Sequence, residues 1–282
     1  MKNVSVIGAG LMGSQIAMCA AFAGFKVHLH DIDENRLTNG QNQLFKQIDK
    51  YITKGMLTSE QFEQAKQNLI LETSLTNAVE QADLVIEAIV EDLSLKRELF
   101  QQLDQLAPAH TILATNSSMI VSSMLAPSTD RPDKVCNLHF FNPVFIMAVV
   151  EVVKGAHTSD DTVQTVVNFV KQINKTPLLL QKEVTGFIAN RILSKIMEEA
   201  MFLLEEGIAT VEEIDLACTK ALNHPIGPFA LMDLTGLDTA YAIQKTQFEL
   251  EEDAKEPSQL LKEKLDHGQL GRKTGQGFYT YQ

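Results

Sequence analysis

The chain has 282 residues, 45% of them hydrophobic, which predicts two domains with a sizeable buried core. Its formal net charge of −12 argues against general binding to nucleic acid or to an anionic membrane, because both need a sustained basic face. The first residues, Met1-Lys2-Asn3, resemble neither a secretory signal nor a transit peptide, and no long uninterrupted apolar run follows. We therefore expect a soluble, cytoplasmic protein. Its three cysteines lack the spacing of a metal site, so no metal is expected.

Residues 1–180 alternate short β-branched runs with longer amphipathic ones, a pattern typical of an α/β fold with a mostly parallel sheet. Apolar residues occupy successive positions of most runs, which suits strands covered on both faces. The expected strands are Val4–Ile7, Val27–His30, Asn68–Leu71, Leu84–Ala88, Ile112–Thr115, Val135–Phe140, Val149–Val153 and Leu178–Leu180.

The connection formed by residues 32–67 is longer than a crossover between parallel strands needs. We expect it to be a helical insertion with two helices. The first spans about Glu34 to Tyr51, and the second opens at Thr58, where Thr58 and Gln61 form a capping-box pattern. The Lys54-Gly55 pair predicts the turn between them.

After Gln181 strand signals nearly vanish, and the rest of the chain predicts an all-α C-terminal domain. The expected helices are Gly186–Glu205, Val211–Ala221, Phe229–Gln247 and Ser258–His267. The first of them has apolar residues on more than one face, which predicts burial, including burial in a subunit interface. We place the domain boundary near Glu183, giving domains of residues 1–183 and 184–282.

A glycine-rich segment, Gly8-Ala9-Gly10-Leu11-Met12-Gly13, follows the first strand and opens a helix over Ser14–Ala23. Gly8 permits a tight turn, Gly10 lets the backbone approach a pyrophosphate, and Gly13 lets helix and strand pack closely. The helix N-terminus offers N–H groups and a partial positive charge to phosphates. This segment predicts a Rossmann-type dinucleotide-binding domain.

Asp31 ends the second expected strand, at the distance from the glycines where a carboxylate accepts hydrogen bonds from the adenosine ribose. Its charge would repel a 2'-phosphate, so Asp31 favours NAD over NADP. In the alternative interpretation the glycines only make a turn and Asp31 caps a helix.

Oxidation of a secondary alcohol needs a base, and histidine is the usual one. His139 is placed at the carboxyl end of an expected strand, the edge where open α/β sheets bind ligands. Glu151 lies in the apolar run Val149–Val153, where a buried carboxylate needs a partner, and His139 would meet that need. The alternatives are a core histidine and a surface glutamate on an edge strand.

Small polar residues in Ala114-Thr115-Asn116-Ser117-Ser118 follow another expected strand and so share that edge of the sheet. They can hydrogen-bond a substrate oxygen or a carboxamide, although serine-rich turns after strands are also ordinary helix caps.

Taken together, these motifs resemble the L-3-hydroxyacyl-CoA dehydrogenase family, and within it the bacterial 3-hydroxybutyryl-CoA dehydrogenases, over essentially the full length of the chain. The matching stretches are Val6–Gly13, Ile86–Ala88, His139–Pro143, Gly186–Arg191, Pro225–Pro228 and Gly271–Tyr279.

The resemblance implies a role for each matching position. His139 would be the base paired with Glu151, and Ser118 and Asn190 would hydrogen-bond the substrate oxygen. Because Asn190 belongs to the second domain, both domains would have to close on the substrate. Lys50 and Lys54 match positions that meet the CoA phosphates.

On the cofactor side, Glu91 and Lys96 match residues near the nicotinamide ribose and carboxamide, and Asn116 matches a residue lining the nicotinamide pocket. The full set of expected NAD contacts is Gly8, Gly10, Leu11, Met12, Gly13, Asp31, Ala88, Glu91, Lys96, Asn116, His139 and Asn142.

One departure concerns the serine motif, which in many members is Asn-Thr-Ser-Ser and here is Asn116-Ser117-Ser118-Met119. An ungapped alignment selects Ser118 as the active-site serine, and a shift by one selects Ser117. The serine replaced by Met119 is expected to alter substrate preference slightly.

The resemblance implies NAD-dependent oxidation of a short-chain (S)-3-hydroxyacyl-CoA to the 3-ketoacyl-CoA, together with the reverse reduction, in a homodimer formed through the C-terminal domain. One alternative is a dehydrogenase of the same fold that acts on a 3-hydroxy acid without CoA or on a sugar acid. Another is a dinucleotide-binding protein without catalysis.

Overall fold

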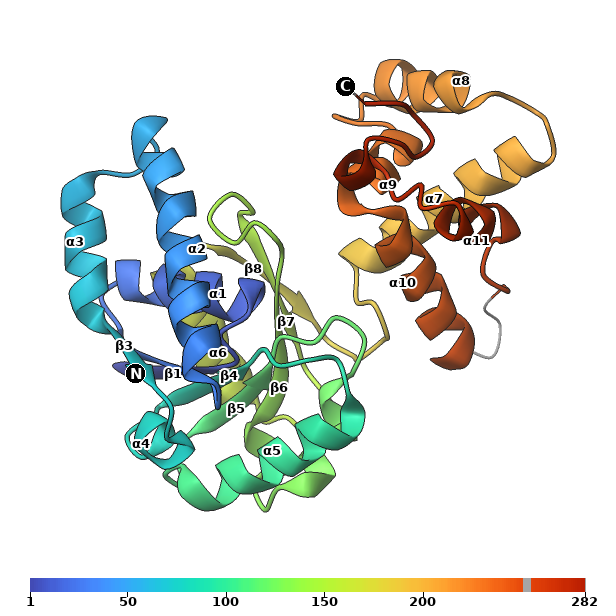
Figure 1. The fold of residues 1–282 in the computed structure, drawn as a ribbon. Coiled ribbons are helices and arrows are strands. Elements are labelled where there is room, and N and C mark those ends of the chain that lie inside the picture. The colour runs from blue at the N-terminus through green and yellow to red at the C-terminus, as the bar shows by residue number, and fades with distance from the viewer. Residues whose placement is uncertain (251–254, 282) are drawn as a thin grey trace. The chain divides into compact units, whose positions relative to one another are not determined.

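The computed structural model describes residues 1–250 and 255–281, and it divides the chain into two compact units, Met1–Ile188 and Ala189–Gln282 (Figure 1). Unit 1 contains the sheet and unit 2 contains helices. No helix among the described residues has both the length and the apolar content needed to cross a bilayer.

The sheet of unit 1 has eight strands in the order β3-β2-β1-β4-β5-β6-β7-β8. The strands are β1 (Asn3–Ile7), β2 (Lys26–His30), β3 (Leu69–Glu72), β4 (Leu84–Glu87), β5 (Ile112–Thr115), β6 (Val135–Phe140), β7 (Val149–Val153) and β8 (Thr176–Leu180). Neighbouring strands are parallel except β6 and β7, which are antiparallel. β2 and β3 are added on one side of β1 and the strands from β4 onward on the other, which is the Rossmann arrangement. The expected fold class is confirmed.

The helices of unit 1 cover both faces of this sheet (Figure 1). They are α1 (Leu11–Phe22), α2 (Glu34–Thr53), α3 (Ser59–Asn68), α4 (Leu75–Val79), α5 (Leu93–Leu106) and α6 (Asp160–Gln172), with short 3-10 turns η1 (Ser122–Met124), η2 (Ala126–Ser128) and η3 (Pro132–Lys134). One core joins the strands to α1, α2, α3 and α6, and a second core joins them to α4 and α5. The sheet is therefore buried on both sides, which explains its continuous apolar strands.

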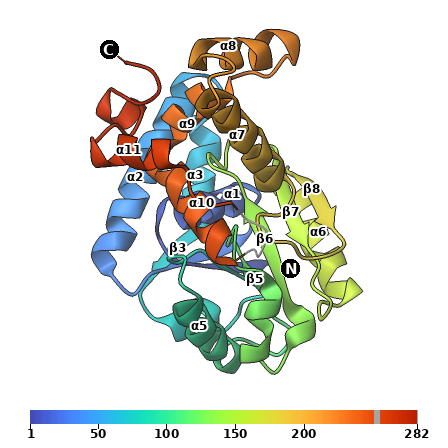
Figure 2. The ribbon, with the colours of Figure 1, turned by 90° about the vertical axis from the view of Figure 1, so that its right-hand side faces the viewer.

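The insertion between β2 and β3 is the pair α2 and α3, which lie side by side in both views (Figures 1 and 2). Phe45 of α2 packs edge-on against Phe62 of α3 at 5.0 Å between ring centroids. Gly55 makes the turn with a φ of 70°, and Thr58 and Gln61 form the expected capping box. The predicted helical insertion is confirmed.

Unit 2 consists of α7 (Ala189–Glu205), α8 (Val211–Leu216) continuing into a π-helical turn η4 (Ala217–Ala221), α9 (Pro228–Thr235), α10 (Leu237–Leu250), α11 (Gln259–Asp266) and the 3-10 turn η5 (Arg272–Thr274). Its core gathers Met201, Ile214, Phe229 and Met232 with residues of α10 and α11. The expected all-helical C-terminal part is confirmed.

Three of the expected helices start or break at other positions than predicted. The one expected over Ser14–Ala23 is α1, which begins three residues earlier, at Leu11. The segment predicted as one helix over Phe229–Gln247 is α9 followed by α10, because Gly236 between them has a φ of 102° that a helix cannot contain. The helix predicted from Gly186 begins three residues later, at Ala189. Gly186 and Phe187 both adopt left-handed conformations, with φ of 75° and 52°.

The expectation that α7 is buried around more than one face is wrong within the single chain. Ala200 and Met201 are buried in the core of unit 2, whereas Ile192 is 59% exposed and Phe202 is 44% exposed. The apolar residues of α7 that do not pack in this core therefore lie at the surface of the chain.

Phe278 and Tyr279 are held by a buried carboxylate of unit 2. Asp233 on α9 accepts hydrogen bonds from the backbone N–H groups of Phe278 and Tyr279, both at 2.8 Å. A Cβ on Gly277 would lie 2.0 Å from the carboxylate of Asp233, so only glycine fits there. The motif at the C-terminus therefore serves to close the core of unit 2.

Candidate active site

A groove of about 1110 Å³ follows the carboxyl ends of β1, β2, β4 and β5 in unit 1. The expected cofactor residues that line it are Gly8, Gly10, Leu11, Met12, Asp31, Ala88, Glu91, Lys96 and Asn116, and Ser118 lines it as well. These residues come from four segments of the chain, which the parallel topology brings to one edge of the sheet.

The glycine-rich turn has the tight geometry that a pyrophosphate site needs. Gly8 has a φ of 108°, and a Cβ there would lie 2.5 Å from the carbonyl oxygen of Ala88. A Cβ on Gly13 would lie 1.8 Å from the carbonyl oxygen of Gly8, so Gly13 lets α1 pack against the turn. Apart from Gly10 itself and its two chain neighbours, no atom of the described residues lies within 4 Å of the Cβ position of Gly10, which leaves the backbone at the start of α1 open to a ligand.

Asp31 is a buried carboxylate at the end of β2 that lines the groove. Its oxygens accept hydrogen bonds from the N–H groups of Ala9, at 3.0 Å, and Asp33, at 3.2 Å. The residue that caps α2 is Asp33, so the interpretation of Asp31 as a helix cap is wrong. Each carboxylate oxygen can accept a further hydrogen bond, which fits a ribose diol.

Lys96 and Glu91 form a charged network with Glu87, the last residue of β4. The ammonium of Lys96 lies 2.5 Å from Glu87 Oε1 and 3.2 Å from Glu91 Oε2. Glu87 is fully buried and Lys96 is 1% exposed, so this ion pair is shielded from solvent. Glu87 was not among the residues assigned from the sequence, although a carboxylate in an apolar strand is the signal that singled out Glu151.

The two candidate serines have different surroundings. The hydroxyl of Ser117 is buried, donates to Glu91 and accepts from the N–H of Ile120 at 2.8 Å. Ser118 is half-exposed, and both serines belong to the lining of the groove. Asn116 Oδ1 accepts from the N–H of Phe140 at 2.9 Å, which fixes the side chain between β5 and β6. The hydroxyl of Ser117 is thus engaged in hydrogen bonds within the fold, whereas Ser118 is accessible to a ligand.

His139 and Glu151 face each other across the antiparallel strands β6 and β7. The Nδ1 atom of His139 lies 2.8 Å from Glu151 Oε2, and both side chains are buried. In the described residues neither His139 nor Asn142 belongs to the lining of the groove. Asn142 is joined to that lining through Gln15, whose amide donates to Asn142 Oδ1 at 3.2 Å.

The segment before α7 also contacts the His139–Glu151 pair. The N–H of Ile188 donates to Glu151 Oε1 at 3.0 Å, so both oxygens of this carboxylate are engaged. The ring of Phe187 lies 5.4 Å from the ring of His139. Sequence analysis could not anticipate these contacts, because they depend on the left-handed backbone of residues 186 and 187.

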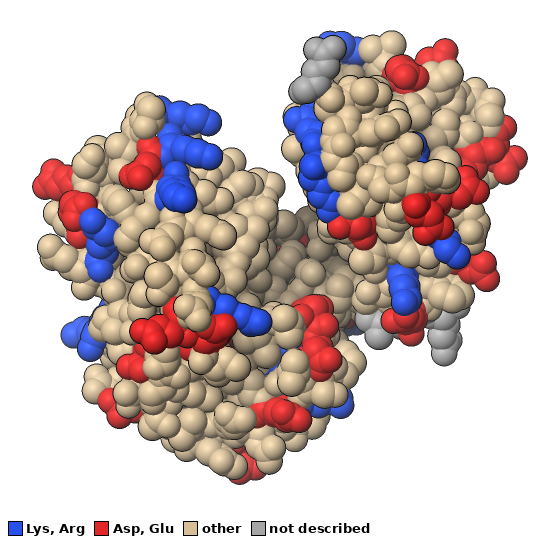
Figure 3. Space-filling model, in the orientation of Figure 1, with Lys and Arg blue, Asp and Glu red and all other residues tan. Residues whose placement is uncertain are grey.

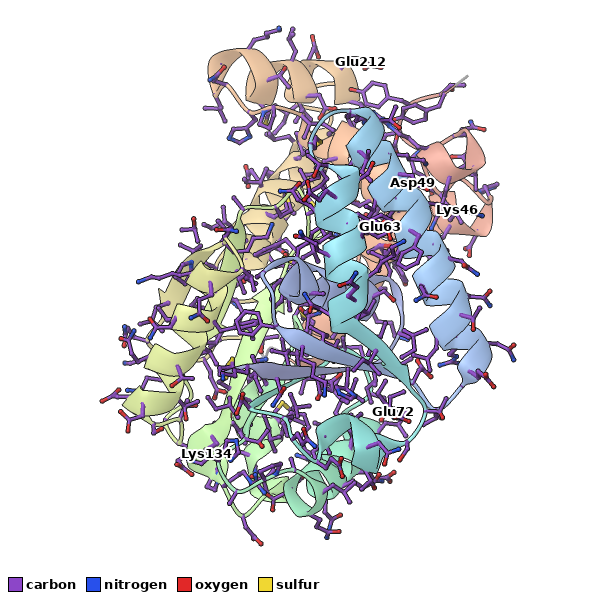
Figure 4. All side chains as sticks on the ribbon, turned by 90° about the vertical axis from the view of Figure 1, so that its left-hand side faces the viewer. Lys46, Asp49, Glu63, Glu72, Lys134 and Glu212 are labelled. Atoms are coloured by element: carbon purple, nitrogen blue, oxygen red, sulfur yellow. The ribbon has the colours of Figure 1, made fainter. Side chains whose placement is uncertain are left out.

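The remaining predicted residues lie outside the groove. Asn190 is half-buried in the first turn of α7, in unit 2. Lys50 and Lys54 are exposed at the C-terminal end of α2, about one and two turns beyond Gln47, which lines the groove. In Figure 3, Lys and Arg side chains gather over this end of α2. Figure 4 shows Lys46 on the same helix, one turn before Lys50 and not identified from the sequence as a candidate, with Asp49 beside it.

Comparison with known proteins identifies the family in both units. Residues 3–184 match the model of the 3-hydroxyacyl-CoA dehydrogenase NAD binding domain, and residues 186–281 match the model of the C-terminal domain of 3-hydroxyacyl-CoA dehydrogenase. Together the two matches span nearly the whole chain.

Full-length relatives agree with these matches. A probable 3-hydroxybutyryl-CoA dehydrogenase of Bacillus subtilis is 38% identical, covering 100% of this chain and 98% of its own length. The solved (S)-3-hydroxybutyryl-CoA dehydrogenase PaaH1 of Ralstonia eutropha is 38% identical with a TM-score of 0.92, covering 100% of this chain and 99% of that one. A solved diketoreductase, described as a dual catalyst of dicarbonyl compounds, is also 38% identical with a TM-score of 0.90, covering 100% of this chain and 99% of that one.

The glycine turn, the buried carboxylate of Asp31 and the groove agree with an NAD-binding domain, and the relatives extend over the entire chain. This protein therefore belongs to the 3-hydroxyacyl-CoA dehydrogenase family of NAD-dependent oxidoreductases.

Proposed function

We propose that this protein catalyses the NAD-dependent oxidation of short-chain (S)-3-hydroxyacyl-CoA to 3-ketoacyl-CoA and the reverse reduction, as in fatty acid or butanoate metabolism. The observation that carries this proposal is the buried pair His139 and Glu151 at 2.8 Å, in a chain with the family's two domains. A histidine held by a carboxylate is the arrangement that alcohol oxidation needs.

The base in this proposal is the Nε2 atom of His139. With Nδ1 donating to Glu151, Nε2 is the nitrogen that can accept a proton from the 3-hydroxyl. Glu151 keeps the ring in this tautomer and stabilises the imidazolium that forms. The second carboxylate oxygen accepts from Ile188, so the carboxylate itself is held in place.

The groove provides the residues that would hold NAD. The pyrophosphate would lie at the start of α1, against Gly8, Gly10, Leu11 and Met12 of the lining, with Gly13 letting α1 pack close to the turn. Asp31 would accept hydrogen bonds from the adenosine ribose hydroxyls. Ala88, Glu91, Lys96, Asn116 and Asn142, with His139, would contact the nicotinamide half. When bound, NAD supplies the acceptor for the hydride from carbon 3.

The substrate side involves both units. Ser118 and Asn190 would donate hydrogen bonds to the substrate oxygen. Each preorganised donor would contribute about 3 kcal/mol to stabilising the negative charge that develops on that oxygen. Lys50 and Lys54 would meet the CoA phosphates as a local basic patch on an acidic protein. We assign residues 1–183 to cofactor binding and residues 184–282 to substrate contacts and dimerisation.

The decisive assay follows NADH oxidation with acetoacetyl-CoA and, separately, with free acetoacetate. Turnover with the thioester and little with the free acid is the expected result. The variant His139→Ala should lose turnover by several orders of magnitude and still bind NADH. Near-normal turnover of that variant would remove His139 as the base.

A second candidate function is the reduction of a dicarbonyl or the oxidation of a hydroxy acid or sugar acid without CoA. The similarity to the diketoreductase, which equals that to the Ralstonia enzyme in sequence identity, favours keeping it. Equal turnover of the thioester and the free acid would support this candidate. The intact His139–Glu151 pair speaks against a dinucleotide-binding protein without catalysis.

We further propose a cytoplasmic homodimer formed through unit 2. The exposed apolar residues Ile192 and Phe202 on α7 support an interface there, and the unpaired cysteines Cys19, Cys136 and Cys218 fit a reducing compartment. Light scattering should give twice the chain mass, and Ile192→Glu should shift the protein toward the monomer.

A further inference from the structure

The side chains beneath the nicotinamide half of the groove form a closed ring of hydrogen bonds. Glu87 accepts from Lys96 at 2.5 Å and from the Thr115 hydroxyl at 2.6 Å. Lys96 continues to Glu91 at 3.2 Å. Glu91 accepts from the Ser117 hydroxyl, and the N–H of Ser117 donates to Thr115 Oγ1 at 3.1 Å, which closes the ring.

This ring joins three segments of unit 1 that sequence alone does not connect. Glu87 ends β4, Lys96 lies in the first turns of α5, and Thr115 ends β5. Oε1 of Glu87 also accepts from the N–H of Ile89 at 2.7 Å, so the carboxylate accepts from three donors in all. Four ring members are buried, whereas 42% of the Glu91 side chain is exposed. Glu91, Lys96 and Ser117 line the groove.

The ring holds an uncompensated charge. It contains the two carboxylates of Glu87 and Glu91 and a single ammonium, that of Lys96, so one negative charge is in excess. Burial keeps the Glu87 part of this charge away from solvent screening.

The position of this charge relative to the cofactor halves follows from the topology. The glycine turn after β1 marks the pyrophosphate, and Asp31 after β2 marks the adenosine side. The ring after β4 and β5 lies on the opposite side of the turn, where the nicotinamide half belongs. The nicotinamide ring is a cation in NAD+ and neutral in NADH.

We propose that Glu87 is a positioning and charge-setting residue that raises the affinity of the site for the oxidised cofactor relative to the reduced one. The proposal rests on the proposed function only in that the groove binds NAD. The excess negative charge stabilises the nicotinamide cation and not the neutral dihydronicotinamide, and Glu87 keeps Lys96 from neutralising Glu91 completely.

The test measures dissociation constants of NAD+ and NADH by calorimetry on the full chain, for wild type and Glu87→Gln. In Glu87→Gln the dissociation constant of NAD+ should rise by a factor about tenfold larger than that of NADH. A tenfold change in this ratio equals about 1.4 kcal/mol, or about 30 mV in the two-electron potential of the bound cofactor.

A matched control is Asp104→Asn, which makes the same change in a half-buried ion pair with Arg131 at 2.6 Å, in unit 1 and outside the groove lining. It should lower the melting temperature and leave the NAD+/NADH affinity ratio unchanged. Equal weakening of both cofactor forms by Glu87→Gln, or an equal ratio shift in Asp104→Asn, would overturn the proposal.

If Glu87→Gln does not fold, Glu91→Gln removes the same excess charge at the exposed member of the ring and should shift the ratio in the same direction. Ser117→Ala, which opens the ring without changing charge, should leave the ratio unchanged. An unchanged ratio in Glu91→Gln overturns the proposal. Wild-type binding of NAD and turnover of the thioester test the proposed function separately from this ratio.

Discussion

Glu151 lies directly opposite His139 in the antiparallel ladder of β6 and β7, and its carboxylate reaches the Nδ1 atom at 2.8 Å. Side chains directly opposite in such a ladder share one face of the sheet. A shift of the register by one residue would move Glu151 to the other face and leave a buried carboxylate without this partner. The pairing therefore depends on strand register as much as on the two residues.

Replacing Glu151 with Gln should lower kcat by about 10² to 10⁴, because the amide cannot stabilise an imidazolium and can impose the wrong tautomer. Affinity for NADH should stay within about twofold, because Glu151 does not line the groove. Steady-state kinetics and NADH fluorescence give both values. The double variant with His139→Ala should be no slower than His139→Ala alone, and additive losses would contradict a joint role.

Ser118→Ala and Ser117→Ala separate the two candidate serines. Ser118→Ala should lower kcat by about 10² or more with little change in melting temperature, because it removes a donor to the substrate oxygen. Ser117→Ala should lower the melting temperature by several degrees, since its hydroxyl bonds Glu91 and the N–H of Ile120. Kinetics and thermal unfolding of both variants are the measurements. The opposite pattern would assign the substrate contact to Ser117.

Charge reversal at Lys50 or Lys54 should raise the KM for a CoA thioester by about tenfold and leave turnover of any small free acid unchanged. Loss of attraction to the CoA phosphates is the reason, and added salt should shrink the effect. Lys171→Glu, an exposed lysine on α6 with the same change in net charge, is the control. An equal rise in KM for Lys171→Glu would indicate only a general field effect.

His28 on β2 should make the protein less stable in acid. Burial, and then the charge of Lys26, lowers the pKa of His28, and its buried Nδ1 atom has no hydrogen-bond partner among the described residues. The stability due to the neutral ring is fully present above the unfolded pKa of about 6.5. It is lost as the pH falls from there through the lowered folded value.

His28→Leu should accordingly raise the melting temperature at pH 5.5 by more than at pH 8, since leucine needs neither proton nor partner. Thermal unfolding at the two pH values measures this. His110→Leu should show no such gain, because His110 is exposed and bonded to Asp83 at 3.1 Å. An equal rise in melting temperature for His28→Leu at both pH values would mean that protonation of His28 does not contribute to the loss of stability in acid.

Local sequence determined the elements whose causes are local. The glycine turn at Gly8, the capping box of Thr58 and Gln61, and the apolar strands all appear in the structure where the sequence predicts them. Backbone conformation and capping act within a few residues, so the order of residues is enough to predict them. The break at Gly236 is the exception, because an isolated glycine inside a helical pattern is often tolerated.

Apart from the capping box and the pair of His139 and Glu151, tertiary structure decided which polar side chains meet. Glu87, Lys96 and Thr115 form one buried network although they come from different elements, and nothing in their spacing reveals it. The same holds for the contact of Ile188 with Glu151. It also holds for Ser117, whose hydroxyl is bonded to Glu91 and to the N–H of Ile120, whereas Ser118 is half-exposed in the groove. Sheet order and register bring these groups within hydrogen-bond distance, and both are properties of the packed chain.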